Sequence, residues 1–111
     1  MFSHIMIGAN DIHASKTFYD AVLGALGCSP GRIDEKGRVF YMTKTGVFGI
    51  SKPINGEPAC AANGGTIGFA ADTPEIADAW YAAKPIVPPF AAHAGSPLIG
   101  LVMPKTPVLV M

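Results

Sequence analysis

The chain has 111 residues, enough for one compact domain but not for two. Half of its residues are apolar, 14% are charged, and eight basic side chains balance eight acidic ones. Nucleic acids and anionic membranes both attract clustered lysine and arginine side chains, so this neutral composition argues against both as partners. The composition instead favours a globular domain with extra apolar surface, either for burial or for an interface.

The sequence predicts a cytoplasmic protein. No apolar run approaches the roughly 20 residues that span a bilayer, and Met1–Ile5 lacks the basic and apolar regions of a signal peptide. Cys28 and Cys60 have neither the spacing of a metal site nor a visible catalytic partner. We therefore expect both to be reduced thiols, as is usual in the cytosol.

The first predicted unit is a strand followed by a helix. Phe2–Gly8 is typical of a buried strand, with side chains alternating between its two faces. Asn10 or Asp11 can cap the helix by accepting a hydrogen bond from its first backbone N–H groups. The helix continues to about Leu26, and Gly27 ends it, because glycine adopts left-handed backbone angles without steric cost.

Three short strands are expected after this helix. They are predicted at Gly31–Asp34, Arg38–Lys44 and Val47–Lys52. Lys36-Gly37 and Thr45-Gly46 are expected to supply the turns between them.

A second strand–helix pair follows a loop. Thr66–Ala71 predicts the strand, and Asp72 or Thr73 the cap of a helix that continues to about Ala83. Pro74 is favourable in the first helical turn, because its missing N–H would have had no partner there.

This second pair repeats the first at a distance of 62 residues. The shift places Ile5 on Ile67 and Phe18-Tyr19 on Trp80-Tyr81, with capping residues in corresponding positions. Such a repeat indicates a duplicated strand–helix unit. The alternative is a coincidence between two ordinary capped helices. In both cases the aromatic pairs are expected to pack in the core.

The last part of the chain, residues 84–111, has a different composition. It contains no Asp or Glu, and its prolines, from Pro85 onward, prevent the helix from continuing. Leu98–Met103 and Val108–Met111 predict two short apolar strands. One hypothesis is that a shifted reading frame replaced an earlier ending, which the gene sequence would test.

The opening of the chain resembles the signature of a known family. The residues that carry the resemblance are Ser3-His4-Ile5-Met6-Ile7-Gly8-Ala9-Asn10-Asp11, then Ser15-Lys16, Phe18-Tyr19 and Leu23-Gly24. They are similar to the start of the glyoxalase/bleomycin-resistance/dioxygenase (vicinal oxygen chelate) superfamily. Gly64–Phe69 is similar to the start of that family's second module. The resemblance covers residues 1 to 83.

The resemblance implies an α+β fold. Residues 1–111 would form one domain, with a βαβββ module over residues 1–54 and an incomplete second module over residues 64–111. The modules would build a curved mixed sheet around a cavity. Family members commonly pair modules between subunits, so we expect a homodimer, which would also cover unpaired strand edges.

Metal-using members of the family hold one divalent ion with four side chains. By resemblance, His4 occupies the ligand position of the first strand, but its repeat partner is Thr66, a weak ligand. The strand Val47–Lys52 has no carboxylate or imidazole, and residues 84–111 lack the family's closing strand. His93 could approach His4 and complete a partial site. We therefore predict no cofactor, with one divalent metal ion bound at His4 as the alternative.

Three residues are the candidates for ligand binding: His4, Tyr41 and Phe48. His4 could instead be a hydrogen-bonded core residue, and aromatic side chains in strands commonly pack in the core. His13, at the start of the first helix, is expected to be solvated. No catalytic residue can be assigned, because no acid–base pair or nucleophile with a base is visible.

Two functions follow from these observations, and they differ in class. The first is a small-molecule-binding protein of the glyoxalase/bleomycin-resistance type, without the family's full metal site, which needs only a concave apolar surface with a few polar anchors. The alternative is a metal-dependent lyase, isomerase or dioxygenase acting on a small oxygenated substrate. A relative that has lost its ligand is a third interpretation.

Overall fold

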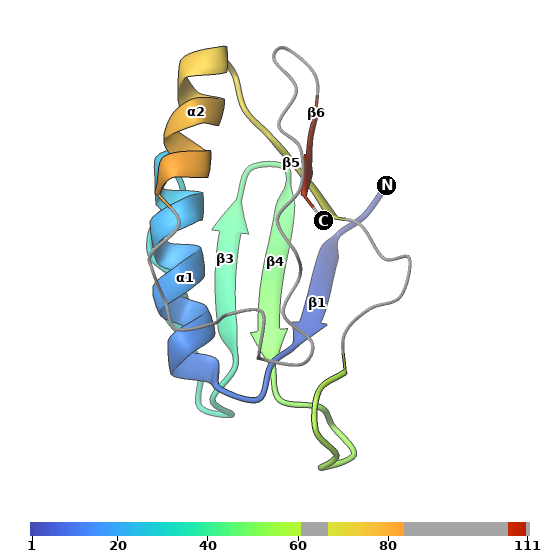
Figure 1. Ribbon diagram of the computed structural model, residues 1–111. Coiled ribbons are helices and arrows are strands. Elements are labelled where there is room, and N and C mark those ends of the chain that lie inside the picture. The colour runs from blue at the N-terminus through green and yellow to red at the C-terminus, as the bar shows by residue number, and fades with distance from the viewer. Residues whose placement is uncertain (61–66, 84–106, 111) are drawn as a thin grey trace.

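The computed structural model describes residues 1–60, 67–83 and 107–110 (Figure 1). Its first unit is the predicted strand and helix, β1 (His4–Gly8) and α1 (Ile12–Ala25). Of the two candidate caps, Asp11 is the one used, since its carboxylate accepts from the Ala14 amide at 2.9 Å. Gly27 follows the helix with φ = 88°, as its predicted role in ending the helix requires.

Three strands follow, β2 (Arg32–Ile33), β3 (Val39–Thr43) and β4 (Gly46–Ser51). The sheet order is β1-β4-β3-β2, with β1 parallel to β4 and the other neighbours antiparallel. The predicted βαβββ plan is therefore confirmed. The β3–β4 turn lies one residue earlier than predicted, at residues 44–45, because the Thr43 hydroxyl donates to the Gly46 carbonyl and holds Gly46 in β4.

The second unit contains β5 (Ile67–Ala70) and α2 (Pro74–Ala82). Thr73 is its cap, accepting from the Ile76 amide at 3.2 Å. The predicted last strand is found as β6 (Pro107–Val110), which pairs antiparallel with β5. The predicted strand Leu98–Met103 lies outside the described residues.

The core lies between α1 and one face of the four-stranded sheet. Strand alternation and register bring side chains of β3 and β4 to this face in pairs, Val39 with Ile50 and Tyr41 with Phe48. Figure 1 shows α2 beside α1, and Trp80 of α2 joins the core at 1% exposure. The buried side chains that meet these strands from α1 include Phe18, Tyr19, Val22 and Leu23.

Two side chains that could have been buried in the core are exposed in the structure. Tyr81, expected in the core, is 60% exposed, whereas Tyr19 at the corresponding repeat position is buried. His4 is exposed rather than a core residue, since it lies on the face opposite Phe48 at an end of β1 where Ile5 is exposed as well. Among the described residues, neither helix is long and apolar enough to cross a membrane.

Candidate functional site

The three predicted ligand-binding residues, His4, Tyr41 and Phe48, line a single cavity of about 850 Å³. The cavity lies between the four-stranded sheet and β5, where β1 and β4 begin and α1 ends. We call it the seam cavity. Tyr41 and Phe48 share one face of the sheet, whereas His4 reaches the rim of the cavity from the other face, and the role of all three in binding stays a prediction.

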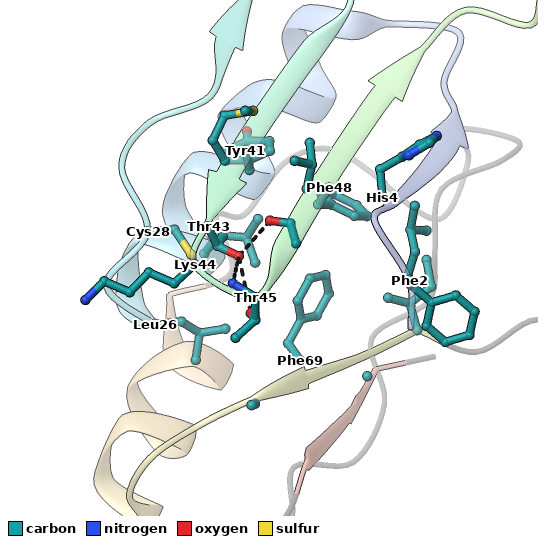
Figure 2. Close-up of a pocket in the computed structure, with 18 of the residues that line it drawn as sticks. Phe2, His4, Leu26, Cys28, Tyr41, Thr43, Lys44, Thr45, Phe48 and Phe69 are labelled. Carbon is teal, nitrogen blue, oxygen red and sulfur yellow. Dashed lines mark hydrogen bonds between the residues drawn. The ribbon is translucent and has the colours of Figure 1, made fainter.

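Aromatic rings form the inner wall of the seam cavity. Phe48 lies in β4 and packs against Tyr19 of α1, with ring centroids 4.9 Å apart. Phe69 of β5 meets Phe48 edge to face, at a centroid distance of 5.4 Å. Figure 2 shows the Phe69 side chain rising from β5 toward the sheet, with Leu26 from the end of α1 beside it. This edge-to-face pair joins the first unit to the second.

The Tyr41 ring lines the cavity, but its hydroxyl is already bonded within the core. It donates to the Asp20 carboxylate at 2.9 Å. Burial raises the pKa of Tyr41, and the adjacent Asp20 carboxylate raises it further. Burial also acts to raise the pKa of Asp20, but hydrogen bonds from Lys16, the Gly31 amide and Tyr41 outweigh it and leave that pKa lowered. Tyr41 is only 1% exposed, so it supports the wall from within the core and has no free hydroxyl to offer a ligand.

Two polar side chains of the cavity, those of Thr43 and Cys28, are engaged or unreactive. The Thr43 hydroxyl donates to the Gly46 carbonyl at 2.7 Å and faces the amide of Thr45 at 3.3 Å. Cys28 is half-buried, and this burial raises the pKa of its thiol, so the nucleophilic thiolate is disfavoured. Neither Thr43 nor Cys28 is therefore placed to act as a nucleophile.

His4 lies apart from the aromatic wall. Ile5, its neighbour, pairs with Phe48, so His4 itself sits on the opposite face of the sheet, beside Val47. In Figure 2 the imidazole is turned away from Phe69. Its Nδ1 lies 2.8 Å from the Ser3 hydroxyl, which can fix the orientation of the ring.

The described residues do not assemble the family's metal ligands around His4. Within residues 1–60, 67–83 and 107–110, no three His, Cys, Asp or Glu side chains are grouped so that they could hold a metal ion. The strand neighbours on the His4 face are Val47 and Gly49, which have no ligating side chain. His93, the predicted partner of His4, lies outside the described residues, as does Thr66. His13 is exposed at the start of α1, as predicted.

Sequence reasoning missed Leu26, Cys28 and Phe69 as wall residues. Phe69 had a usable signal, because the 62-residue shift places it on Ile7, a residue of the core face of β1. Leu26 and Cys28 flank Gly27 just after α1, so their place at the cavity depends on how the helix end meets the sheet. That packing has no signature in the local sequence.

Neither the scan of family models nor the search of curated proteins found a match. Among solved structures, the chain is similar to a glyoxalase/bleomycin resistance protein from Albidiferax ferrireducens T118, with 55% sequence identity and a TM-score of 0.71. The alignment covers 75% of this chain and 66% of that one, so this chain spans about two thirds of the relative's length. With the βαβββ order and this identity together, the chain belongs to the glyoxalase/bleomycin-resistance superfamily.

Proposed function

We propose that this protein binds an apolar small molecule in the seam cavity, and that this binding needs no metal ion. The observation that carries the proposal is the edge-to-face pair of Phe48 and Phe69, which faces a cavity of about 850 Å³. Ligand cavities are typically about 300–1,000 Å³ in volume, and the seam cavity is within this range. The rings present hydrophobic surface, while the Thr43 hydroxyl is bonded to the protein and would fix ligand orientation only weakly.

The test uses an uncharged fluorescent probe, N-phenyl-1-naphthylamine. We expect saturable binding that perturbs the amide NMR signals of Leu26, Cys28 and Phe69. Phe69→Ala should weaken binding at least fivefold, because it removes one ring of the pair. Phe40→Ala is the matched control, since Phe40 is also a half-buried strand phenylalanine but does not line the cavity.

Two results would contradict the proposal. One is an absence of saturable binding to a folded protein, with folding checked by circular dichroism. The other is an equal loss of affinity in the Phe69→Ala and Phe40→Ala variants, since that would place the probe outside the seam cavity.

A metal-dependent lyase, isomerase or dioxygenase is the second candidate function. It is favoured by one observation, the exposed imidazole of His4 at the family's first ligand position, with Ser3 in place to orient it. Near-stoichiometric zinc, nickel, manganese or iron in the purified protein, lost in His4→Ala, would support this function over metal-free binding.

A homodimer is part of the proposal. β1 is an edge strand of the four-stranded sheet, so within the described sheet one of its edges has no neighbour. Apolar side chains around this edge are exposed, including Phe2 at 74% and Ile5 at 39%. A second copy would cover both features. Light scattering should give twice the mass of one chain, and a monomer at micromolar concentration would contradict this.

A further inference from the structure

A second cavity, of about 960 Å³, lies at the end of the sheet opposite the seam cavity. Its walls come mainly from four separate segments, the start of α1, the β2–β3 hairpin, the end of β4 and the loop after β4, and Met6 of β1 adds to them. All four lie at the lower end of the molecule in Figure 1. Among the described residues, it shares no lining residue with the seam cavity, so it has to be explained independently.

Basic side chains converge on this cavity. Lys36, Arg38 and Lys52 line it, which is three of the eight basic residues of a chain with no net charge. Among the described residues that line it, Asp11 is the one carboxylate, and it is hydrogen-bonded to the Ala14 amide as the helix cap. The first turn of α1 carries no acidic residue, so its N-terminus adds further positive potential. The cavity therefore has an excess of positive charge.

The three cations differ in availability. The Arg38 guanidinium is paired with Asp34 through its Nε at 2.7 Å and stands over the Phe40 ring at 5.1 Å. Lys36 and Lys52 are exposed, and within the described residues neither has a carboxylate at ion-pair distance. These two ammonium groups are the ones that an anionic group could meet without displacing a protein carboxylate.

The backbone that carries these cations is held in place. Asp34 accepts hydrogen bonds from the amides of Lys36 at 3.0 Å and Arg38 at 2.9 Å, which fixes the β2–β3 turn. On the other wall, the Asn10 side chain accepts from the Ala59 amide at 2.7 Å and ties the loop after β4 to the start of α1. A site whose walls are fixed in this way loses less conformational entropy when a ligand binds.

The remaining wall is apolar. Met6, Ile12, Ile33 and Ile54 contribute side chains from four different segments. An inorganic anion would leave this surface in contact with water. A ligand that joins one anionic group to an apolar body would match both parts of the cavity.

We propose that this second cavity binds small molecules in which one carboxylate or similar anionic group is attached to an apolar body. Lys36 and Lys52 meet the anionic group, and the isoleucine side chains cover the body. This site is separate from the seam cavity and does not depend on the function proposed for it.

Benzoate and benzamide are the probes, because they have the same shape and differ in charge. Titrated into the full chain, benzoate should shift the amide NMR signals of His13, Gly37 and Lys52 saturably. The expected dissociation constant is on the order of millimolar for a molecule of this size. Benzamide should bind at least fivefold more weakly. Added salt should weaken benzoate binding, because the attraction is partly electrostatic.

Charge-removing variants test the assignment of the two lysines. Lys36→Gln combined with Lys52→Gln should weaken benzoate binding at least fivefold. Lys44→Gln removes a charge from the β3–β4 turn at the opposite end of the sheet and should leave benzoate binding unchanged. The proposal is overturned if benzamide binds as well as benzoate, if Lys44→Gln loses as much affinity, or if the shifts occur only around the seam cavity.

Discussion

The two strand–helix units of this chain begin in the same way and are buried differently. Both helices start at a side-chain cap, Asp11 in one and Thr73 in the other. The first aromatic residue of each repeated pair is buried, Phe18 at 3% exposure and Trp80 at 1%. The second aromatic residue of the pair differs in burial between the two units: Tyr19 is 2% exposed, whereas Tyr81 is 60% exposed.

The difference comes from what covers each helix. Tyr19 is enclosed by Tyr41 of β3 and Phe48 of β4, strands that follow α1 in the chain. The repeated motif thus specifies a capped helix locally, whereas the burial of its second aromatic residue depends on later strands. Local sequence determines where a helix starts, and tertiary structure determines how much of its surface is buried.

The largest expected effect tests this difference directly. Tyr19→Ala should lower the free energy of unfolding by about 3–5 kcal/mol, because a buried aromatic side chain is lost and leaves a cavity. Tyr81→Ala, the matched change at the repeat position, should lower it by about 1 kcal/mol or less, because this side chain is already 60% exposed. Urea unfolding followed by circular dichroism measures both. Similar losses of unfolding free energy in the two variants would mean that the two tyrosines contribute equally to packing, which would contradict this account.

A variant that keeps the ring provides a control if Tyr19→Ala does not fold. Tyr19→Phe retains the aromatic contacts with Phe48 and should fold with nearly the stability of the original chain, within about 1 kcal/mol. Failure of Tyr19→Phe to fold would show that packing of the ring is not what stabilises this position.

An effect of intermediate size on stability is expected at Gly31, which lies beside buried side chains of β3. A Cβ added at Gly31 would lie 2.5 Å from Val39 Cγ1 and 2.7 Å from Tyr41 Cζ. Gly31→Ala should therefore destabilise the fold by about 1–3 kcal/mol through overpacking. Gly24→Ala is the control within α1, where a Cβ meets nothing within 4 Å, and it should stabilise by about 0.5–1 kcal/mol. Thermal unfolding of both variants should move in opposite directions, and shifts of the same sign would refute this account.

The smallest expected effect concerns pH. Hydrogen bonds to the Asp20 carboxylate hold its pKa below its usual value despite partial burial, so the charged form stabilises the fold above about pH 4. This stabilisation is lost as the pH falls through the lowered pKa of the folded state. Asp20→Ala should cost about 1–2 kcal/mol at pH 7, and the cost should shrink toward pH 3.

Asp78 supplies the corresponding control in α2, since its side chain is exposed and no hydrogen bond or ion pair is described for it. Asp78→Ala should change stability by less than about 0.5 kcal/mol at either pH. Urea unfolding at pH 7 and pH 3 measures the change in unfolding free energy of both variants at each pH. A cost of Asp20→Ala that is the same at both pH values would show that its charge is not involved.

The sequence was sufficient to predict the elements of the first unit, because their signals are local. Caps, glycine stops and alternating apolar residues predicted the βαβββ order, with errors of a residue or two at element ends. The exposure of His4 and Tyr81 was not predicted, since it depends on which other segments pack beside them. The second cavity was also missed, because Lys36, Arg38 and Lys52 are brought together only by the fold.

The parallel pairing of β1 with β4 has a consequence for how the chain is made. His4 pairs with Val47, so the partner of the first strand is synthesised 43 residues later. At about 5–20 residues per second, β1 waits on the order of seconds after it leaves the ribosome before β4 can pair with it. During that interval the apolar run Ile5-Met6-Ile7 has no strand partner. Until β4 is made, this run is therefore open to association with other apolar surfaces, so the long separation in sequence exposes the growing chain to misassembly.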